Sequence, residues 1–221
     1  MDDNTLTKKM VVFDMDNTLL RGRFIDTCSQ QYNFTQALGL LRQIDHDPVS
    51  LTVRIASFLK DRSKSELIDI AEEIPMVDDI VTVVNELKKR SFIIGIISDS
   101  YQLITDHFAK KLGADFSMGN ELQYEGEILT GHVLIPSYFH YSEQSTCKHQ
   151  VCKTNALRYI TNKHRVKLDD CVVVGDSEND ICMIKHAGLG VAFCTTSELL
   201  RNVAARHIEQ NAFGELLKFT N

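Results

Sequence analysis

The sequence predicts an α/β protein in which a doubly wound parallel sheet carries an inserted bundle of helices. Short, uninterrupted apolar runs such as residues 10–13 are typical of parallel strands that are covered on both faces. These runs alternate with amphipathic helical segments, as in a doubly wound sheet. Residues 24–74 show helical patterns alone, which is too long a stretch for a simple crossover between two strands. We therefore expect a core of residues 1–21 and 76–221 and a helical cap of residues 22–75.

The elements can be placed in order along the chain. Each expected strand of the sheet is a short apolar run, and these strands cover residues 9–13, 92–97, 171–174, 190–193 and a short piece near 207–208. The expected helices outside the insertion cover residues 80–90, a segment ending at 112, 153–163, 178–187, 197–205 and a segment from 213. Residues 121–128 alternate in polarity and predict a β-hairpin outside the main sheet. Residues 136–146 are predicted to be a loop.

Local signals support several of these boundaries. Residues 63–66 read S-K-S-E and resemble a capping box at the start of a helix in the insertion. Gly113 is the expected stop of the helix before it, because glycine accepts the left-handed conformation that ends many helices.

Composition limits the classes of partner. The chain has 221 residues, a formal net charge of −6 and no run rich in lysine and arginine, which argues against nucleic acid or an anionic membrane as the main partner. No apolar run approaches the roughly 20 residues that span a bilayer, and because residues 1–4 are acidic and polar we do not expect them to form a secretory signal. The six cysteines form no C-x-x-C pair, so we expect reduced, mostly buried thiols in a cytoplasmic protein. We expect this protein to be a monomer or a homodimer. Neither zinc spacing nor ligand spacing of the eight histidines is apparent.

Four polar sites follow the ends of predicted strands or begin helices, and we expect them to meet at one edge of the sheet. Asp14 and Asp16 follow the first strand, and Ser98 follows the second. Lys153 opens a helix, with Lys148 as a nearby alternative, and the third central strand leads to Asp176 and Asp180. Clustered carboxylates repel one another unless a cation relieves them, and the hard ion Mg²⁺ suits such oxygen ligands.

This constellation contains what a phosphoryl-transfer site needs. Asp14 suits the role of a nucleophile that forms a covalent aspartyl-phosphate, and Asp16 that of the general acid and then base. The Thr18 hydroxyl is expected to hold Asp16 in place, and Ser98 to cradle the phosphate beside a helix N-terminus. Lys153 supplies a positive charge for the phosphate.

The expected metal ligands are the carboxylates of Asp14 and Asp176, together with the backbone carbonyl of Asp16. Asp180 is expected to hold a metal-bound water or to orient Lys153, and Asn179 to donate to the phosphate. Asp176 and Asp180 could also be ordinary helix-start carboxylates, but the abrupt G-D stop at residues 175–176 after a buried strand favours the functional interpretation.

With these motifs the chain resembles the haloacid dehalogenase-like hydrolases with an inserted helical cap, and within them it is most similar to phosphoserine phosphatases. The four family motifs correspond to D-x-D-x-T at residues 14–18, the serine at 98, the lysine at 153 and G-D-x-x-N-D-x-x-M at 175–183. Each motif alone is weak evidence for the family, but four motifs in the right order are strong evidence. The resemblance implies a Mg²⁺-dependent hydrolase of small phosphomonoesters that works through a phospho-aspartate.

Two positions depart from the phosphoserine phosphatase pattern. These relatives carry an acidic residue, which meets the ammonium group of the substrate, where this chain has Arg23. They carry glycine after the second-motif serine, where this chain has Asp99, another expected substrate contact. Arg23 would repel an ammonium and favour an additional anionic group. Arg54 falls near the arginine that contacts the substrate carboxylate in the family, and both arginines could equally be surface residues of the cap.

Two alternatives to a hydrolase remain open at this point. A phosphotransferase of the same family would pass the phosphoryl group to an alcohol instead of water. A receiver-type signalling module also uses an aspartate, a lysine and Mg²⁺, but such modules lack a helical insertion and need no second aspartate like Asp16.

Overall fold

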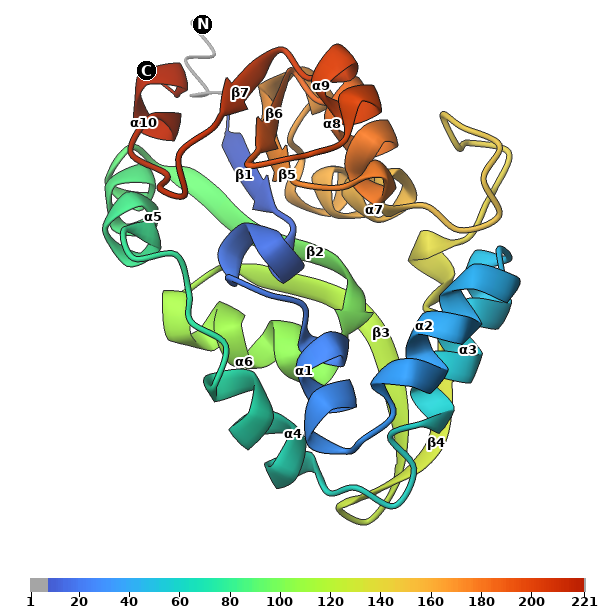
Figure 1. Ribbon diagram of the computed structural model, residues 1–221. Coiled ribbons are helices and arrows are strands. Elements are labelled where there is room, and N and C mark those ends of the chain that lie inside the picture. The colour runs from blue at the N-terminus through green and yellow to red at the C-terminus, as the bar shows by residue number, and fades with distance from the viewer. Residues whose placement is uncertain (1–7, 221) are drawn as a thin grey trace, which may run out of the picture.

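The computed structural model describes residues 8–220, and it confirms the α/β fold with a largely parallel sheet at its centre (Figure 1). Seven strands lie in the order β4-β3-β2-β1-β5-β6-β7, and all neighbours run parallel except β3 and β4. Their bounds are β1 Lys9–Phe13, β2 Phe92–Tyr101, β3 Phe116–Glu125, β4 Ile128–Leu134, β5 Cys171–Gly175, β6 Leu189–Phe193 and β7 Arg206–Ile208.

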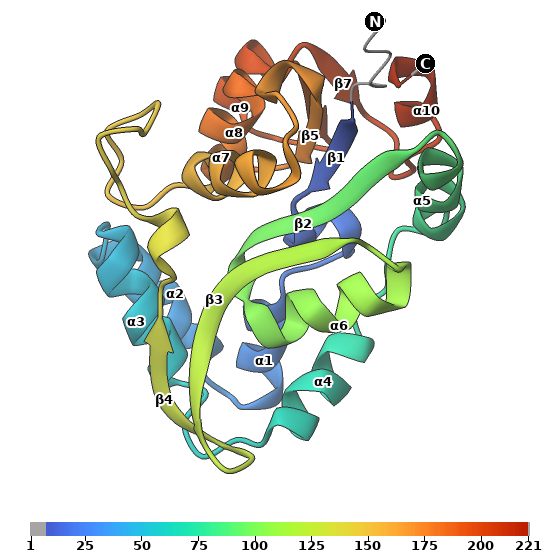
Figure 2. The same ribbon diagram turned by 180° about the vertical axis from the view of Figure 1, so that it is seen from behind.

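Helices cover both faces of this sheet (Figures 1 and 2). The α-helices are α1 Phe24–Gln31, α2 Thr35–Ile44, α3 Pro48–Ser57, α4 Lys64–Glu72, α5 Ile80–Lys89, α6 Gln102–Leu112, α7 Lys153–His164, α8 Ile181–His186, α9 Glu198–Val203 and α10 Leu216–Phe219. None of the helices within residues 8–220 has the length and apolar character that crossing a bilayer requires.

The central strand β1 divides its side chains between two apolar layers. Val11 and Phe13 point into the layer that contains α5 and α6, and Met10 and Val12 into the layer with α7 and α8. This alternation follows from the two-residue period of a strand, and it explains why the whole run is apolar. Phe13 also packs edge to face on Phe213, with ring centroids 5.4 Å apart.

The helices of the insertion, α1 to α4, lie beyond the carboxyl end of β1 (Figure 1). Side chains cap the starts of α3 and α4: the Asp47 side chain accepts from the backbone N–H of Ser50 at 2.6 Å, and Ser63 and Glu66 form the predicted capping box. The division into a core and a cap at residues 22–75 stays a prediction.

Two segments differ from the sequence prediction. The strand expected at 92–97 continues to Tyr101, because its pairing with β3 resumes after a register shift at Tyr101 and Asn120. The hairpin is present, with its turn at Gly126, where φ is +63°, but it does not lie outside the sheet. Its first strand, β3, pairs in parallel with β2, so the hairpin extends the sheet at one edge.

The remaining boundaries lie close to prediction. Gly113 ends α6 with φ of +63°, as a left-handed helix stop should. The helix expected at 178–187 begins as a 3₁₀ turn, Glu178–Asp180, before α8. The segment predicted to be a loop contains a short 3₁₀ turn, Ser137–Phe139, and one isolated β-bridge from His140 to Val151.

Candidate active site

The carboxyl end of β1 positions the two motif aspartates in different surroundings. Asp14 is 3% exposed, and its backbone N–H donates to the Val174 carbonyl of β5 at 2.9 Å. The chain then turns sharply at Asn17, which has φ of +57°. This turn directs the half-buried Asp16 toward the start of α1, where its Oδ1 accepts the backbone N–H of Phe24 at 3.0 Å. Asp14 is therefore fixed by the sheet, and Asp16 by the first helix of the insertion.

Lys153 joins the motifs at the centre of the site. Its Nζ lies 2.5 Å from Asp14 Oδ1, 2.8 Å from Asp180 Oδ1 and 3.9 Å from Asp99 Oδ1. The side chain is 4% exposed, whereas the alternative Lys148 is exposed. Burial works against the charge of Lys153, but the three carboxylates outweigh it and hold its pKa well above the usual value. Lys153 is therefore a permanent cation beside Asp14.

Asp180 is held by the turn that follows β5. Its Oδ2 accepts the backbone N–H groups of Asp176 and Ser177 at 3.2 and 3.1 Å, while Oδ1 accepts from Lys153. A Cβ at Gly175 would lie 2.5 Å from the Asp180 carboxyl group, so only glycine leaves room for this arrangement. The expected role of Asp180 in orienting Lys153 agrees with this geometry.

Three carboxylates form a cluster that fits a divalent metal ion. One oxygen from each of Asp14, Asp176 and Asp180 lies within 4.8 Å of the others. The Oδ1 atom of Asp176 is buried, and none of the residues 8–220 forms a hydrogen bond with it. Three carboxylates beside one lysine leave two negative charges uncompensated, and an oxygen-only donor set suits a hard cation. The side chain of Asp16 does not belong to this cluster.

The titration of these acids reflects burial and crowding. Burial raises the pKa of Asp14 well above its usual value, although Lys153 opposes the shift. Burial and the neighbouring Asp180 raise the pKa of Asp176 to about 6. Burial also raises the pKa of Asp16 to about 7, against the hydrogen bond from Phe24. A general acid whose pKa lies near the working pH can both donate and accept a proton.

A cavity of about 150 Å³ opens above the two motif aspartates. Its lining combines acids, arginines, apolar side chains and small polar groups: Asp14, Asp16, Arg23, Ile25, Arg42, Leu51, Thr52, Ile55, Asp99, Ser100, Tyr101, Ser177 and Asn179. The core supplies the aspartates, and the insertion supplies most of the apolar wall. A small molecule bound here would contact both.

The arginines of the insertion are placed differently from the sequence expectation. Arg23 lines the cavity as expected, but Arg54 does not: it forms an ion pair with Asp45 at 3.1 Å, and half of its side chain is exposed. Neighbouring residues on a helix point about 100° apart, so Ile55 faces the cavity and Arg54 turns away. Arg42, which sequence reasoning did not identify, lines the cavity instead, and its Nη1 is paired with Asp26 at 2.7 Å. No sequence pattern identifies Arg42, because the packing of α2 against α3 decides whether its side chain faces the cavity.

Two expectations about polar residues beside the aspartates need correction. Ser98 lies inside β2 and is buried, four residues before α6 begins, so it is not at a helix N-terminus; its Oγ accepts the Ser100 N–H at 3.2 Å. The Thr18 hydroxyl does not hold Asp16, because its Oγ1 is buried without a hydrogen-bond partner among the described residues. The backbone N–H of Phe24 holds the Asp16 carboxylate instead.

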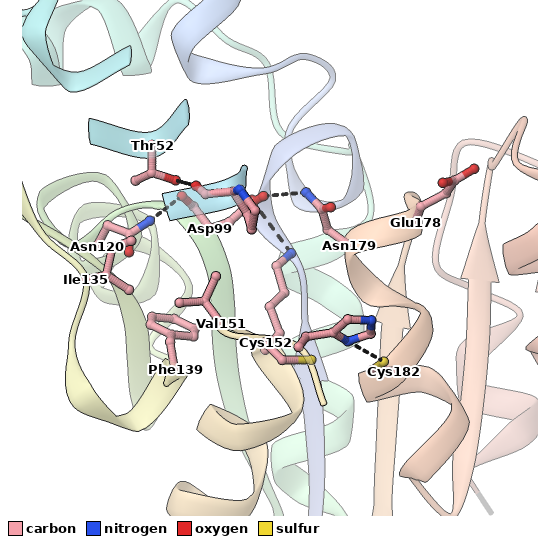
Figure 3. A pocket seen from close by; sticks show the side chains of 13 residues that line it. Thr52, Asp99, Asn120, Ile135, Phe139, Val151, Cys152, Glu178, Asn179 and Cys182 are labelled. Carbon is pink, nitrogen blue, oxygen red and sulfur yellow. Dashed lines mark hydrogen bonds and ion pairs between the residues drawn. The ribbon is translucent and has the colours of Figure 1, made fainter. Parts of the chain in front are cut away.

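A second, larger cavity of about 260 Å³ adjoins the first and is shown in Figure 3. Asp99 and Asn179 line both cavities, and the Asn179 amide donates to Asp99 Oδ2 at 2.6 Å between them. The Asn120 amide, which sequence reasoning also missed, donates to the Asp99 carbonyl at 2.6 Å. Burial would raise the pKa of Asp99, but Lys153, Arg23 and the hydrogen bond from the Asn179 amide hold it below its usual value.

Comparisons with known proteins agree with this architecture. A model of the haloacid dehalogenase-like hydrolase family matches residues 11–185. The chain is 28% identical to a phosphoserine phosphatase of Methanocaldococcus jannaschii, over 96% of this chain and 97% of that protein. It is 31% identical to the phosphoserine phosphatase SerB2 of Mycobacterium tuberculosis, over 90% of this chain but only 47% of that longer protein.

Solved structures are also similar. A phospho-aspartyl intermediate analogue of phosphoserine phosphatase superimposes with a TM-score of 0.79 at 26% identity, covering 97% of this chain and 100% of that one. A phosphoserine phosphatase in its apo form superimposes with a TM-score of 0.80 at 27% identity, with the same coverage.

Proposed function

The chain belongs to the haloacid dehalogenase-like hydrolases and is a phosphatase, and from this premise we propose that it hydrolyses a small phosphomonoester through a phosphorylated Asp14 with the help of Mg²⁺. One observation carries the proposal: the buried Asp14 lies 2.5 Å from Lys153, inside a carboxylate cluster that opens into a cavity. This arrangement offers a fixed nucleophile, a cation and a metal-binding oxygen set at one point.

In the first step Asp14 attacks the phosphorus atom, and the bond to the leaving-group oxygen breaks. Lys153 holds the attacking carboxylate in place and offsets its repulsion from the phosphate. Asp16, whose pKa is raised to about 7, donates its proton to the departing oxygen.

In the second step water attacks the phosphorus of the acyl phosphate, and Asp16, now ionised, takes the proton of that water. Asp14 is released as a carboxylate together with inorganic phosphate. When bound, Mg²⁺ would neutralise phosphate oxygens and the carboxylates that Asp14, Asp176 and Asp180 provide. Asp180 keeps Lys153 in position throughout.

We further propose that residues 22–75 act as a cap that closes over the substrate and selects it. The wall that this segment contributes contains Arg23 and Arg42 beside Ile25, Leu51 and Ile55. Arg42 is already paired with Asp26 at 2.7 Å, so Arg23 is the arginine that would recognise an anionic group of the substrate. We therefore expect the preferred substrate to carry a second anionic group on a short, partly apolar body. In the phosphoserine phosphatases that the chain resembles, an acidic residue for the substrate ammonium stands where Arg23 stands here.

A panel of phosphomonoesters, assayed with and without Mg²⁺, tests this function. The panel should include phosphoserine, phosphoethanolamine, sugar phosphates and phosphorylated carboxylic acids. We expect release of inorganic phosphate that depends on Mg²⁺ and is greatest for substrates with a second anionic group. If phosphate release stays low while added alcohols yield new phosphoesters, the enzyme is a phosphotransferase and the hydrolase proposal is wrong.

Replacing Arg23 by glutamate should shift substrate preference toward amino-bearing phosphomonoesters. The reversal of charge at the cavity wall attracts an ammonium and repels a second anion, and we expect a change in the ratio of the two kcat/KM values on the order of tenfold or more. Arg54→Gln is the matched control, because Arg54 lies on the insertion but outside the cavity lining. If Arg23→Glu and the wild type prefer the phosphomonoesters in the same order, Arg23 takes no part in substrate recognition.

Mg²⁺ should stabilise the protein against heat. At a concentration 100 times the dissociation constant, a ligand that binds only the folded state adds about 2.7 kcal/mol, which raises Tm by roughly 5 to 10 °C for a chain of this size. Asp176→Asn should abolish that rise, while its metal-free form is at least as stable as metal-free wild type, because one crowded charge is gone.

The control for this experiment is Asp169→Asn, an exposed acid before the amino end of β5. It should keep the full Mg²⁺-dependent rise in Tm, as measured by scanning calorimetry. If the Tm of Asp176→Asn still rises by about 5 to 10 °C on addition of Mg²⁺, the ion binds at another site.

A further inference from the structure

A second group of potential metal ligands lies outside the carboxylate cluster, where the loop before α7 meets α8. Its members are the side chains of Cys147, His149, Cys152 and Cys182, whose ligand atoms all lie within 4.8 Å of one another. The Cys182 sulfur is 3.3 Å from His149 Nδ1. Figure 3 shows Cys152 and Cys182 side by side at one end of the larger cavity.

The spacing of these atoms is close to that of a tetrahedral zinc site. Zinc–sulfur bonds of about 2.3 Å and zinc–nitrogen bonds of about 2.0 Å place the ligand atoms of a tetrahedron roughly 3.5 to 3.8 Å apart. Because no two of these atoms are more than 4.8 Å apart, a contraction of at most about 1 Å would bring the group to that geometry. Three sulfurs and one imidazole are soft and borderline donors, which select zinc over the hard Mg²⁺ suited to the carboxylates.

We propose that this group binds one zinc ion in a structural site of the Cys₃His type. The sequence concealed it, because no C-x-x-C pair is present and Cys182 follows Cys152 only after the whole of α7 and β5. The fold brings the two segments together. A site with four protein ligands is closed, so the ion would act by holding structure and not by binding substrate.

A disulfide accounts for the group less completely. One bond could join two of the three sulfurs, but it would leave the third thiol and the imidazole without a function. The other described cysteines do not approach this group: Cys28 and Cys171 are buried in the core, and Cys194 hydrogen-bonds to the Glu209 carbonyl. These cysteines therefore serve as internal controls.

The position of the group links it to catalysis. Cys152 directly precedes Lys153, and Cys182 follows Asp180 by two residues. Lys153 Nζ and Asp180 Oδ1 are 2.8 Å apart. An ion bound to both cysteines would hold the start of α7 against the start of α8, and so would keep the lysine in register with its carboxylate partner.

Metal analysis of the protein, purified under reducing conditions without a metal-affinity tag, tests the proposal. We expect one zinc per chain by inductively coupled plasma mass spectrometry, and less than a tenth of that in Cys182→Ser and in Cys147→Ser. Two controls should keep one zinc: Cys194→Ser, which alters an exposed thiol, and Asp176→Asn, which alters the carboxylate cluster.

A measurement on the wild-type protein keeps the test valid if the cysteine variants fail to fold. Replacing zinc by Co²⁺ should give the thiolate charge-transfer absorption and the intense visible bands of a tetrahedral ion. Three results would overturn the proposal: no zinc and no such spectrum, zinc that is lost in Asp176→Asn, or a disulfide within the group by peptide mass mapping of the freshly purified protein. None of these readouts depends on phosphatase activity, so the proposed function stands or falls separately.

Discussion

Asp14→Asn is expected to lose on the order of 10⁴-fold or more in kcat while the protein stays folded. The amide is close in shape to the carboxylate but is too weak a nucleophile to form the acyl phosphate. The fold should tolerate it, because Lys153 keeps Asp180 as a partner at 2.8 Å and one crowded negative charge is removed. Turnover of p-nitrophenyl phosphate and the thermal unfolding curve measure the two effects.

The companion variant Asp16→Asn separates the nucleophile from the proton donor. We expect it to form the phosphoenzyme from p-nitrophenyl phosphate, whose leaving group needs little protonation, and to release a burst of nitrophenolate. With an alkyl phosphate the same variant should be nearly inactive.

If Asp14→Asn retained turnover similar to that of the wild type, Asp14 would not be the nucleophile and the proposed mechanism would be wrong.

Lys153→Ala is expected to have a large effect on both stability and activity. Removing one partner of a buried charge network costs about 3 to 5 kcal/mol, because Asp14 and Asp180 would be left without their cation. Activity should fall by about 10²- to 10³-fold through loss of the charge beside the phosphate. The deficit in the free energy of unfolding should shrink when Mg²⁺ is added, since a bound dication offsets the same carboxylates.

Lys148→Ala is the matched control, because Lys148 is exposed and lies only five residues earlier. It should change the free energy of unfolding by no more than about 0.5 kcal/mol in urea denaturation. Equal losses in the two variants, or none in Lys153→Ala, would contradict the central position assigned to Lys153.

The polar residues at the ends of β1 and β5 were predictable because strand ends are local signals. A buried apolar run followed by an acid is visible in the sequence, and parallel neighbours must present those acids at one edge of the sheet. The same reasoning found Lys153, since the start of α7 was recognisable. Gly175 was visible too, although only the structure explains that its missing Cβ leaves room for Asp180.

What sequence reasoning missed depends on packing between elements. Arg42 lines the cavity and Arg54 does not, because α2 and α3 are each rotated about their own axis so that only Arg42 faces it. The helical periodicity of the sequence does not fix this rotation precisely enough to tell one residue from its neighbour. The continuation of β2 past Ser98 rests on pairing with β3, and the Asn120 contact to Asp99 follows from that pairing. Such long-range pairings leave no pattern within either segment.

The hairpin of β3 and β4 has a mechanical consequence for the helical insertion. Besides the two chain crossings that join the insertion to the sheet, the backbone of residues 61–64 is hydrogen-bonded to residues 127–129 at the far end of the hairpin, as in Asp61 N–H to the Leu129 carbonyl at 2.9 Å. The hairpin therefore holds the insertion in addition to its two chain connections and to the contacts of α4, whose Glu72 bonds to His107 and Lys111 of α6. We expect any swing that admits substrate to weaken the hydrogen bonds at the tip of this hairpin, so hydrogen exchange at residues 127–129 should report on opening even though they lie outside the cavity lining.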